Sequence, residues 1–125
     1  LNEKSNKKAY MINLLELKEM AQYKDKSISM TGREAYVGKY GKQAFKSAIL
    51  LGGDFTFNGR IIGDSLIQHN APLDTQGKWQ AIGIVEYTKP CKMLELEKIP
   101  GYSKSLVDRE AGLKRTCYIY ATKNT

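Results

Sequence analysis

The sequence of 125 residues predicts a single, mainly antiparallel β domain, arranged as a small barrel or a sandwich. Three observations support this fold class. Apolar and polar residues alternate with a period of two in several stretches, glycine-rich turn signals separate these stretches, and only two short segments have helical patterns. A domain of this size buries roughly two-thirds of its unfolded surface, so a core can form without disulfides or a metal.

The N-terminal region is expected to contain an arm and a short helix. Residues 1–11 are polar and basic, and we expect them to form a flexible arm before a domain that covers residues 12–125. Asn13 and Glu16 match a capping box, which predicts a helix over the letters INLLELKEMAQY. The letters LLEL within this segment are also compatible with the start of a strand.

The central region alternates with period two and predicts three strands. The first two cover residues 28–37 and 42–51 and are joined by a turn at the letters GKYGK. A third extended stretch covers residues 55–67, with Asn58-Gly59 as a hairpin-turn signal.

The C-terminal region predicts three further strands and one helix. Residues 79–89 alternate clearly and are followed by a proline, and residues 93–99 form another alternating stretch. Turn residues then lead into a short helix that Gly112 closes. The β-forming residues 115–123 predict the last strand.

The chemistry of the chain indicates a basic protein without a catalytic or metal centre. Twenty basic residues against thirteen acidic ones give a net charge of +7, which favours polyanionic partners. Cys91 and Cys117 are too few for a thiolate zinc site, and the lone His69 has no partners for a metal or a triad. We therefore expect no enzymatic activity, no cofactor and no metal. Because no signal peptide or membrane-spanning run is visible, we also expect a cytoplasmic location.

A mixture of rings and basic side chains in residues 33–46 suggests a nucleic-acid interface. Single-stranded nucleic acid exposes a charged backbone and flat bases, so binding it without reading sequence requires basic side chains and rings. Plain β-hairpins with solvated lysines show the same mixture. The predicted binding residues are Arg33, Tyr36, Lys39, Tyr40, Lys42, Lys46, Phe57, Arg60, Lys78 and Trp79.

The rings in this set differ in how well a core position would explain them. Trp79 fits a core position as well as a binding position, and Phe45 shares a face with apolar neighbours and fits the core better. Tyr40 lies between glycines in the predicted turn, where we expect it to be exposed. On this hypothesis Tyr40→Ala weakens binding with little change in melting temperature.

Four segments, ISMTGREAYVGKYGKQAFKSAILL, NGRIIGDSLI, GKWQAIGIVEYTKP and MLELEKI, resemble in order the strands of an OB-fold barrel. The pattern is similar to the small single-stranded DNA-binding proteins that plasmids and phages encode. The resemblance implies sequence-independent binding of single-stranded DNA, with several copies along the strand linked through the N-terminal arm. Two alternatives stay open, namely an adaptor or inhibitor that binds an acidic protein, and an RNA-binding regulator on the same barrel.

Overall fold

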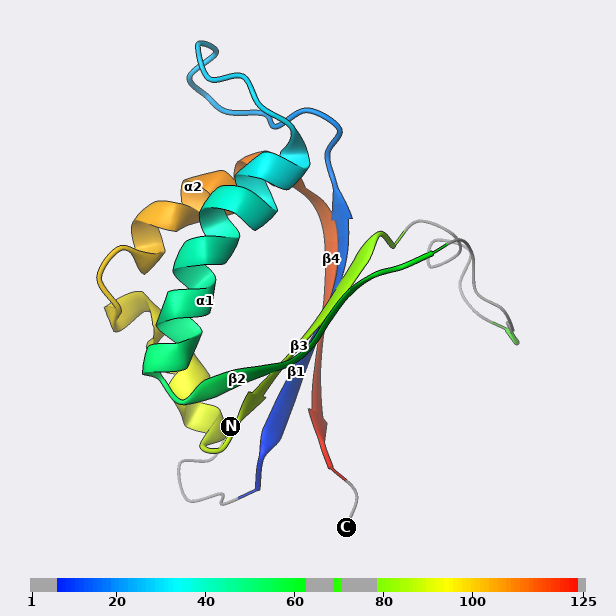
Figure 1. Ribbon diagram of the computed structural model, residues 1–125, viewed down its shortest axis with the longest axis vertical. Helices are drawn as coiled ribbons and strands as arrows, with labels where there is room; N and C mark the ends of the chain where they lie inside the picture. Colours follow the sequence, from blue (N-terminus) through cyan, green and yellow to red (C-terminus); the bar gives the residue numbers. More distant parts are fainter. Residues whose placement is uncertain (1–6, 63–68, 71–78, 124–125) are drawn as a thin grey trace.

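The computed structural model of the protein describes residues 7–62, 69–70 and 79–123 (Figure 1). Within these ranges, no helix is both long and apolar enough to cross a membrane. In chain order the elements are strand β1 (Ala9–Leu17), the π-helical segment η1 (Glu34–Tyr40), helix α1 (Gly41–Leu50), strands β2 (Gly53–Arg60) and β3 (Ala81–Tyr87), the 3-10 helix η3 (Pro90–Lys98), helix α2 (Tyr102–Gly112) and strand β4 (Leu113–Thr122).

The strands form one four-stranded sheet in the order β2-β3-β1-β4, and every neighbouring pair is antiparallel. Helices connect β1 to β2 and β3 to β4, and both connections lie over the same face of the sheet (Figure 1). This is the ferredoxin-like β-α-β-β-α-β arrangement. We call the helix-covered face the inner face and the opposite one the outer face.

The predicted antiparallel, mainly β architecture and the short helix before the last strand are confirmed, but the predicted barrel is wrong. In the described part of the chain, β2 and β4 are the two edges of an open sheet and do not pair with each other. The sheet stays open because the helices, rather than further strands, cover its inner face (Figure 1).

The two strands predicted for residues 28–37 and 42–51 are wrong, since η1 and α1 run continuously over residues 34–50. The apparent alternation arises because side chains repeated every four residues along a helix also fall on every second position of the sequence. Tyr36, Tyr40, Ala44 and Ala48 recur at this spacing and line one side of the helical segment. Glycines on both sides of Tyr40 suggested a turn, yet the contacts of the helix with the sheet override their low helix propensity.

The predicted helix near the N-terminus is also wrong, because β1 covers Ala9–Leu17 and therefore includes the last residues of the predicted arm. Ala9, Met11, Leu15 and Leu17 are buried at alternate positions, so the strand places four apolar side chains on one face that a helix would have dispersed.

Two further predictions fail in the middle and late parts of the chain. Asn58-Gly59 lies inside β2 instead of turning the chain, and a register shift between Phe55 and Phe57 marks an irregularity there. Residues 93–99, predicted as a strand, belong largely to η3, which starts after Lys89 with Pro90 in its first turn. The predicted strands at residues 79–89 and 115–123 are confirmed as β3 and β4.

The core has two parts, both between the sheet and the helices or at their ends. Under α1, a cluster of Met11, Ala48, Val85 and Tyr87 is flanked by Leu51, Phe55 and Met93. At the start of η1, a smaller cluster joins Tyr23, Ala35 and Ala111, and the Tyr23 hydroxyl donates to Asp108 at 2.5 Å. These clusters hold the helical layer at its two ends, while a pocket remains between them.

Candidate functional site

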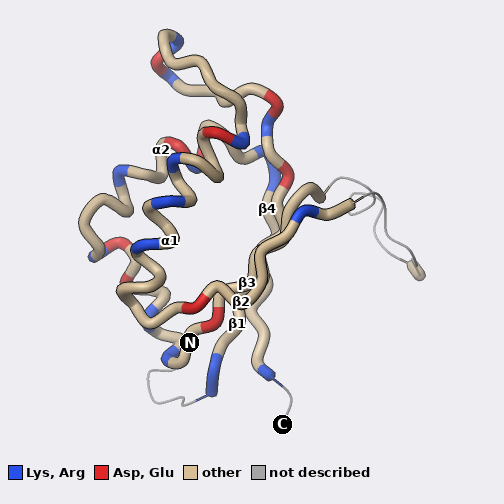
Figure 2. The backbone as a smooth tube through the Cα atoms, viewed as in Figure 1, with Lys and Arg blue, Asp and Glu red and all other residues tan. Residues whose placement is uncertain are grey.

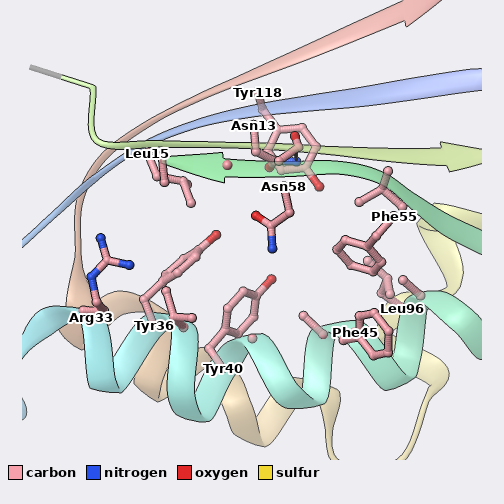
Figure 3. A pocket seen from close by; sticks show the side chains of 18 of the residues that line it. Asn13, Leu15, Arg33, Tyr36, Tyr40, Phe45, Phe55, Asn58, Leu96 and Tyr118 are labelled. Carbon is pink, nitrogen blue, oxygen red and sulfur yellow. Dashed lines mark hydrogen bonds between the residues drawn. The ribbon is translucent and has the colours of Figure 1, made fainter. Parts of the chain in front are cut away.

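A pocket of about 470 Å³ lies between the helical layer and the inner face of the sheet (Figure 3). Segments η1 and α1 form one wall, which we call the roof, and the strands form the opposite wall, which we call the floor. Volumes of this size are typical of sites for small organic molecules.

The floor contains a polar row that crosses the whole sheet. The pairing places Asn58 of β2 opposite Gly83 of β3, Gly83 opposite Asn13 of β1, and Asn13 opposite Tyr118 of β4. Gly83 leaves space in the middle of this row, because a Cβ atom there would meet only the Asn58 Oδ1 atom at 3.8 Å. Polar side chains can therefore point into the pocket from both sides of the glycine (Figure 3).

Asn13 joins the members of this row. Its Nδ2 atom lies 3.4 Å from the Met11 carbonyl oxygen and 3.5 Å from that of Gly83, and its side chain also hydrogen-bonds to Tyr118. Tyr118 as a whole residue is 55% exposed, but its hydroxyl is directed into the pocket (Figure 3).

The roof above this row carries two tyrosines one helical turn apart. The ring centroids of Tyr36 and Tyr40 are 5.1 Å apart, and both hydroxyls point toward the floor (Figure 3). The Tyr40 hydroxyl also lies 3.0 Å from the hydroxyl of Tyr102, which belongs to α2. Hydroxyl and amide groups from five segments of the fold, η1, α2, β1, β2 and β4, thus gather in one half of the pocket.

The other half of the pocket is apolar. The rings of Phe45 and Phe55 are 4.9 Å apart with an interplanar angle of 32°, and Leu96 of η3 lies beside them (Figure 3). Val85 and Ala48 continue the apolar lining into the core. The pocket is therefore divided into a ring-lined end and an oxygen- and nitrogen-lined end.

The tyrosines around the pocket keep their protons at neutral pH. Burial raises the pKa of Tyr36 to about 12 and that of Tyr87 to about 12. Burial also raises the pKa of Tyr40, with the Tyr102 hydrogen bond as the next cause, and burial raises the pKa of Tyr118. These phenols therefore serve as hydrogen-bond donors and not as bases.

The charged side chains that line the described pocket are Arg33 and Arg60, and no carboxylate is among its lining residues. A third arginine, Arg109 of α2, acts on the same region, since its positive charge works against burial to lower the pKa of Tyr36, Tyr40 and Tyr118. The electrostatic environment of the polar end is therefore cationic.

The structure brings together four of the residues predicted to bind nucleic acid, because Arg33, Tyr36, Tyr40 and Arg60 all line the pocket. Tyr40, expected to be exposed, is buried with 9% of its surface accessible. The expected exposure of Tyr40 is therefore wrong, and because its ring lines the roof of the pocket, we now expect Tyr40→Ala to lower the melting temperature.

The remaining predicted residues do not gather around the pocket. Lys39, Lys42 and Lys46 are exposed on the helical segment, and Phe57 is 53% exposed on β2. The Arg115 Cζ atom lies over the Trp79 ring, 4.3 Å from the ring centroid. Lys78 falls outside the described residues. Figure 2 shows basic residues spread over the helices, the loops and the strand ends instead of following one groove.

Sequence reasoning missed most of the floor. Asn13 was assigned to a helix cap and Asn58 to a turn, and Tyr118 was not among the predicted binding residues. One signal was available in β1, where a single amide interrupts a buried apolar face between Met11 and Leu15. A polar residue in such a position indicates a cavity or a buried partner.

Comparisons with known proteins identify structural relatives but no family. No family model matches the chain, and no curated protein matches it. The crystal structure of the methylated RPA0582 protein has a TM-score of 0.79 and 26% identity, over 97% of this chain and 84% of that chain. A second crystal structure of RPA0582, a protein of unknown function from Rhodopseudomonas palustris, gives a TM-score of 0.78 and 26% identity over 97% and 85%.

A more distant similarity involves SnoaB, a cofactor-independent oxygenase from Streptomyces nogalater. Its TM-score is 0.48 and its identity 8%, over 95% of each chain, which is too low to support an argument about this protein.

These findings overturn the single-stranded DNA-binding interpretation, including its OB-fold and its plasmid or phage type. The sheet is open, the rings of Tyr36 and Tyr40 face a pocket under the helices, and the similar structures of RPA0582 share this fold and not an OB-fold barrel. Rings in these positions are not available to stack on the bases of a polymer that lies along the surface.

Proposed function

We propose that the protein binds a small organic molecule with an apolar, ring-sized body and an oxygen-bearing end. The observation that supports this most directly is the division of the pocket. Phe45, Phe55 and Leu96 line one end, whereas hydroxyls and amides of Tyr36, Tyr40 and the floor line the other. Apolar sites with a few convergent polar groups bury a ligand and also fix its orientation.

The composition of the lining favours binding through hydrogen bonds and packing. Tyrosines with raised pKa values donate, and asparagine amides both donate and accept, so a carbonyl, carboxylate or phenol oxygen finds several partners. No histidine, cysteine or carboxylate lines the described pocket. The proposal needs no chemistry beyond these contacts, and the expected lack of enzymatic activity stays a prediction.

Calorimetric titration with two one-ring probes, 4-nitrophenol and its neutral analogue 4-nitroanisole, tests the proposal. Ala44 lines the roof between Tyr40 and Ala48, so the ring in Ala44→Phe occupies the pocket. Lys42→Phe adds the same ring at an exposed position of α1 and serves as the matched control. We expect binding to the natural chain and to Lys42→Phe, and loss of binding in Ala44→Phe.

Two results contradict the proposal. The first is that neither probe binds the natural chain at millimolar concentration. The second is that Ala44→Phe, shown to be folded by circular dichroism, binds them as well as Lys42→Phe does.

A further inference from the structure

We infer that the oxygen held at the polar end of the pocket is an anion, so that the ligands are flat organic oxyanions such as phenolates, enolates and aromatic carboxylates. The inference rests on the proposed function and specifies the charge of the ligand. It is drawn from the presence of neutral hydroxyl donors and of two arginines, Arg33 and Arg60, in the lining of the same pocket.

The donors converge from opposite walls. Tyr36 and Tyr40 point down from the roof, while Asn58 and Tyr118 reach the same space from the floor (Figure 3). A hydrogen bond to an ionised oxygen is roughly twice as strong as one between neutral groups. Several donors that reach the same space therefore favour an oxyanion over a neutral oxygen.

The Tyr40–Tyr102 pair strengthens this donor set. Its hydroxyl oxygens are 3.0 Å apart, and either can be the donor. When Tyr102 donates to Tyr40, the Tyr40 proton is available to the ligand, and a chain of two phenols polarises toward the negative charge. This arrangement connects α2 to the ligand through a residue of η1.

Arginines supply the opposite charge. Arg33 and Arg60 line the pocket, and Arg109 lies two helical turns after Tyr102 on the same side of α2. Arg109 favours negative charge on the Tyr36, Tyr40 and Tyr118 hydroxyls, which surround the polar end. A cation that acts on three positions around a space also acts on an anion within it.

The acidic groups near this region are engaged elsewhere. Asp108 of α2 accepts a hydrogen bond from the Tyr23 hydroxyl, and Glu16 of β1 forms an ion pair with Arg115 at 2.7 Å. Glu34 of η1 accepts a hydrogen bond from the Thr31 hydroxyl at 3.1 Å. The titratable and charged groups that line the pocket are Arg33, Tyr36, Tyr40, Arg60, Tyr87, Tyr102 and Tyr118, and Arg109 of α2 acts on three of these tyrosines through its charge. None of them is a carboxylate.

The phenols do not compete with the ligand for the negative charge. Burial raises the pKa of Tyr36 to about 12, and it raises the pKa of Tyr40 as well. A ligand with a more acidic hydroxyl therefore ionises first, and the protein tyrosines stabilise its charge while remaining protonated.

The experiment uses the visible absorbance of 4-nitrophenolate. Titration of 4-nitrophenol with and without saturating protein gives the pKa of the bound and free probe. We expect the bound pKa to be lower by at least about one unit, which corresponds to about tenfold tighter binding of the anion than of the neutral form. Neutral 4-nitroanisole should bind correspondingly more weakly than 4-nitrophenolate.

Two pairs of variants locate the effect. Arg109→Gln should reduce the shift in the probe pKa, whereas Lys39→Gln removes the same charge from an exposed position and should leave most of the shift intact. Tyr36→Phe and Tyr40→Phe should each reduce the shift while preserving binding of 4-nitroanisole. Tyr36→Phe serves if Tyr40→Phe does not fold.

The outcomes separate this inference from the proposed function. If 4-nitroanisole binds as tightly as 4-nitrophenolate and the probe pKa is unchanged, the inference is wrong while the binding function stands. If Arg109→Gln and Lys39→Gln reduce the shift equally, general charge and not the described site is responsible, and the inference is again overturned. If neither probe binds, both the inference and the proposed function fail.

Discussion

The two faces of the sheet differ in polarity, and the helix-covered face is the one with polar residues at its centre. The inner face, which the helices cover, carries the polar row of Asn13, Asn58 and Tyr118 across its centre. A covered sheet face normally maximises apolar packing. Here a pocket lies over the centre of that face, and the two apolar clusters lie at opposite ends of the helical layer.

The outer face is apolar along the same strands. Ile12 and Leu14 of β1, Ile82 and Ile84 of β3 and Ile119 of β4 occupy the alternate positions, and Ile119 is 41% exposed. On the proposed function, the polar residues of the inner face serve ligand contact, and we expect them to stabilise the fold less than apolar residues in the same positions. The predicted homo-oligomer remains a prediction that no contact in the structure tests.

The largest expected difference between the faces concerns two aromatic rings. Tyr40→Ala removes a buried ring from the roof and should lower the free energy of unfolding by about 3–5 kcal/mol. Phe57→Ala removes a ring that is 53% exposed on β2 and should cost below about 1 kcal/mol. Urea denaturation measures both values. An equally large loss in Phe57→Ala would show that a partner covers the outer face in solution.

The second prediction concerns alkaline pH. Tyr36 and Tyr87 have a pKa of about 12 in the folded protein, above the ordinary value of about 10 in an unfolded chain. Between these values the unfolded chain releases protons that the folded protein retains, so stability is complete below pH 10 and falls as the pH rises toward 12. For the buried Tyr87 the loss is about 2 kcal/mol.

Melting curves at pH 9, 10, 11 and 12 measure this decline. Tyr36→Phe should flatten the dependence, because phenylalanine has no proton to lose. A melting temperature that stays constant from pH 9 to 12 would contradict the burial of these hydroxyls.

The third prediction separates stability from binding. Asn13→Leu replaces the centre of the polar row with an apolar side chain, and its present hydrogen bonds to backbone carbonyls are long, at 3.4 and 3.5 Å. We expect the free energy of unfolding to rise by about 1 kcal/mol while binding of 4-nitrophenol weakens. Ile12→Leu, the neighbouring change on the outer face, should alter neither quantity by much. A strongly destabilised Asn13→Leu would instead give the amide a structural role.

The smallest expected effect is that of Tyr102→Phe. It removes only the hydroxyl that lies 3.0 Å from the Tyr40 hydroxyl, so stability should fall by about 0.5–1.5 kcal/mol. A double-mutant cycle with Tyr40→Phe measures the coupling, since both variants remove the same hydrogen bond. Additive losses would show that the two hydroxyls do not interact in solution.

Some elements of this structure could be predicted from the local sequence pattern. Others depend on contacts between segments that are far apart in the sequence. Strands β3 and β4 and helix α2 follow from alternation and turn signals. The helical segment was missed because Tyr36, Tyr40, Ala44 and Ala48 also fit a period of two, and flanking glycines favoured a turn. The choice between the two periods depends on the packing of these side chains against the sheet.

Only some of the residues that line the candidate site were predicted from the sequence. Arg33, Tyr36, Tyr40 and Arg60 were selected for their chemistry, but the open or enclosed setting that decides the ligand depends on the fold. The polar row was beyond reach, because its residues come from four strands and meet only through the pairing register.

The position of β1 in the sheet has a consequence for how the chain reaches this structure. The first strand in sequence is central, and its two neighbours, β3 and β4, are made of residues 81–87 and 113–122. During synthesis one hydrogen-bonding edge of β1 therefore has no final partner until β3 is made, and the other has none until β4 is made. Pairing over such sequence distances slows folding and leaves an apolar strand open to mispairing in the meantime. The sheet, and with it the floor of the pocket, is complete only when residues 113–122 have paired with β1.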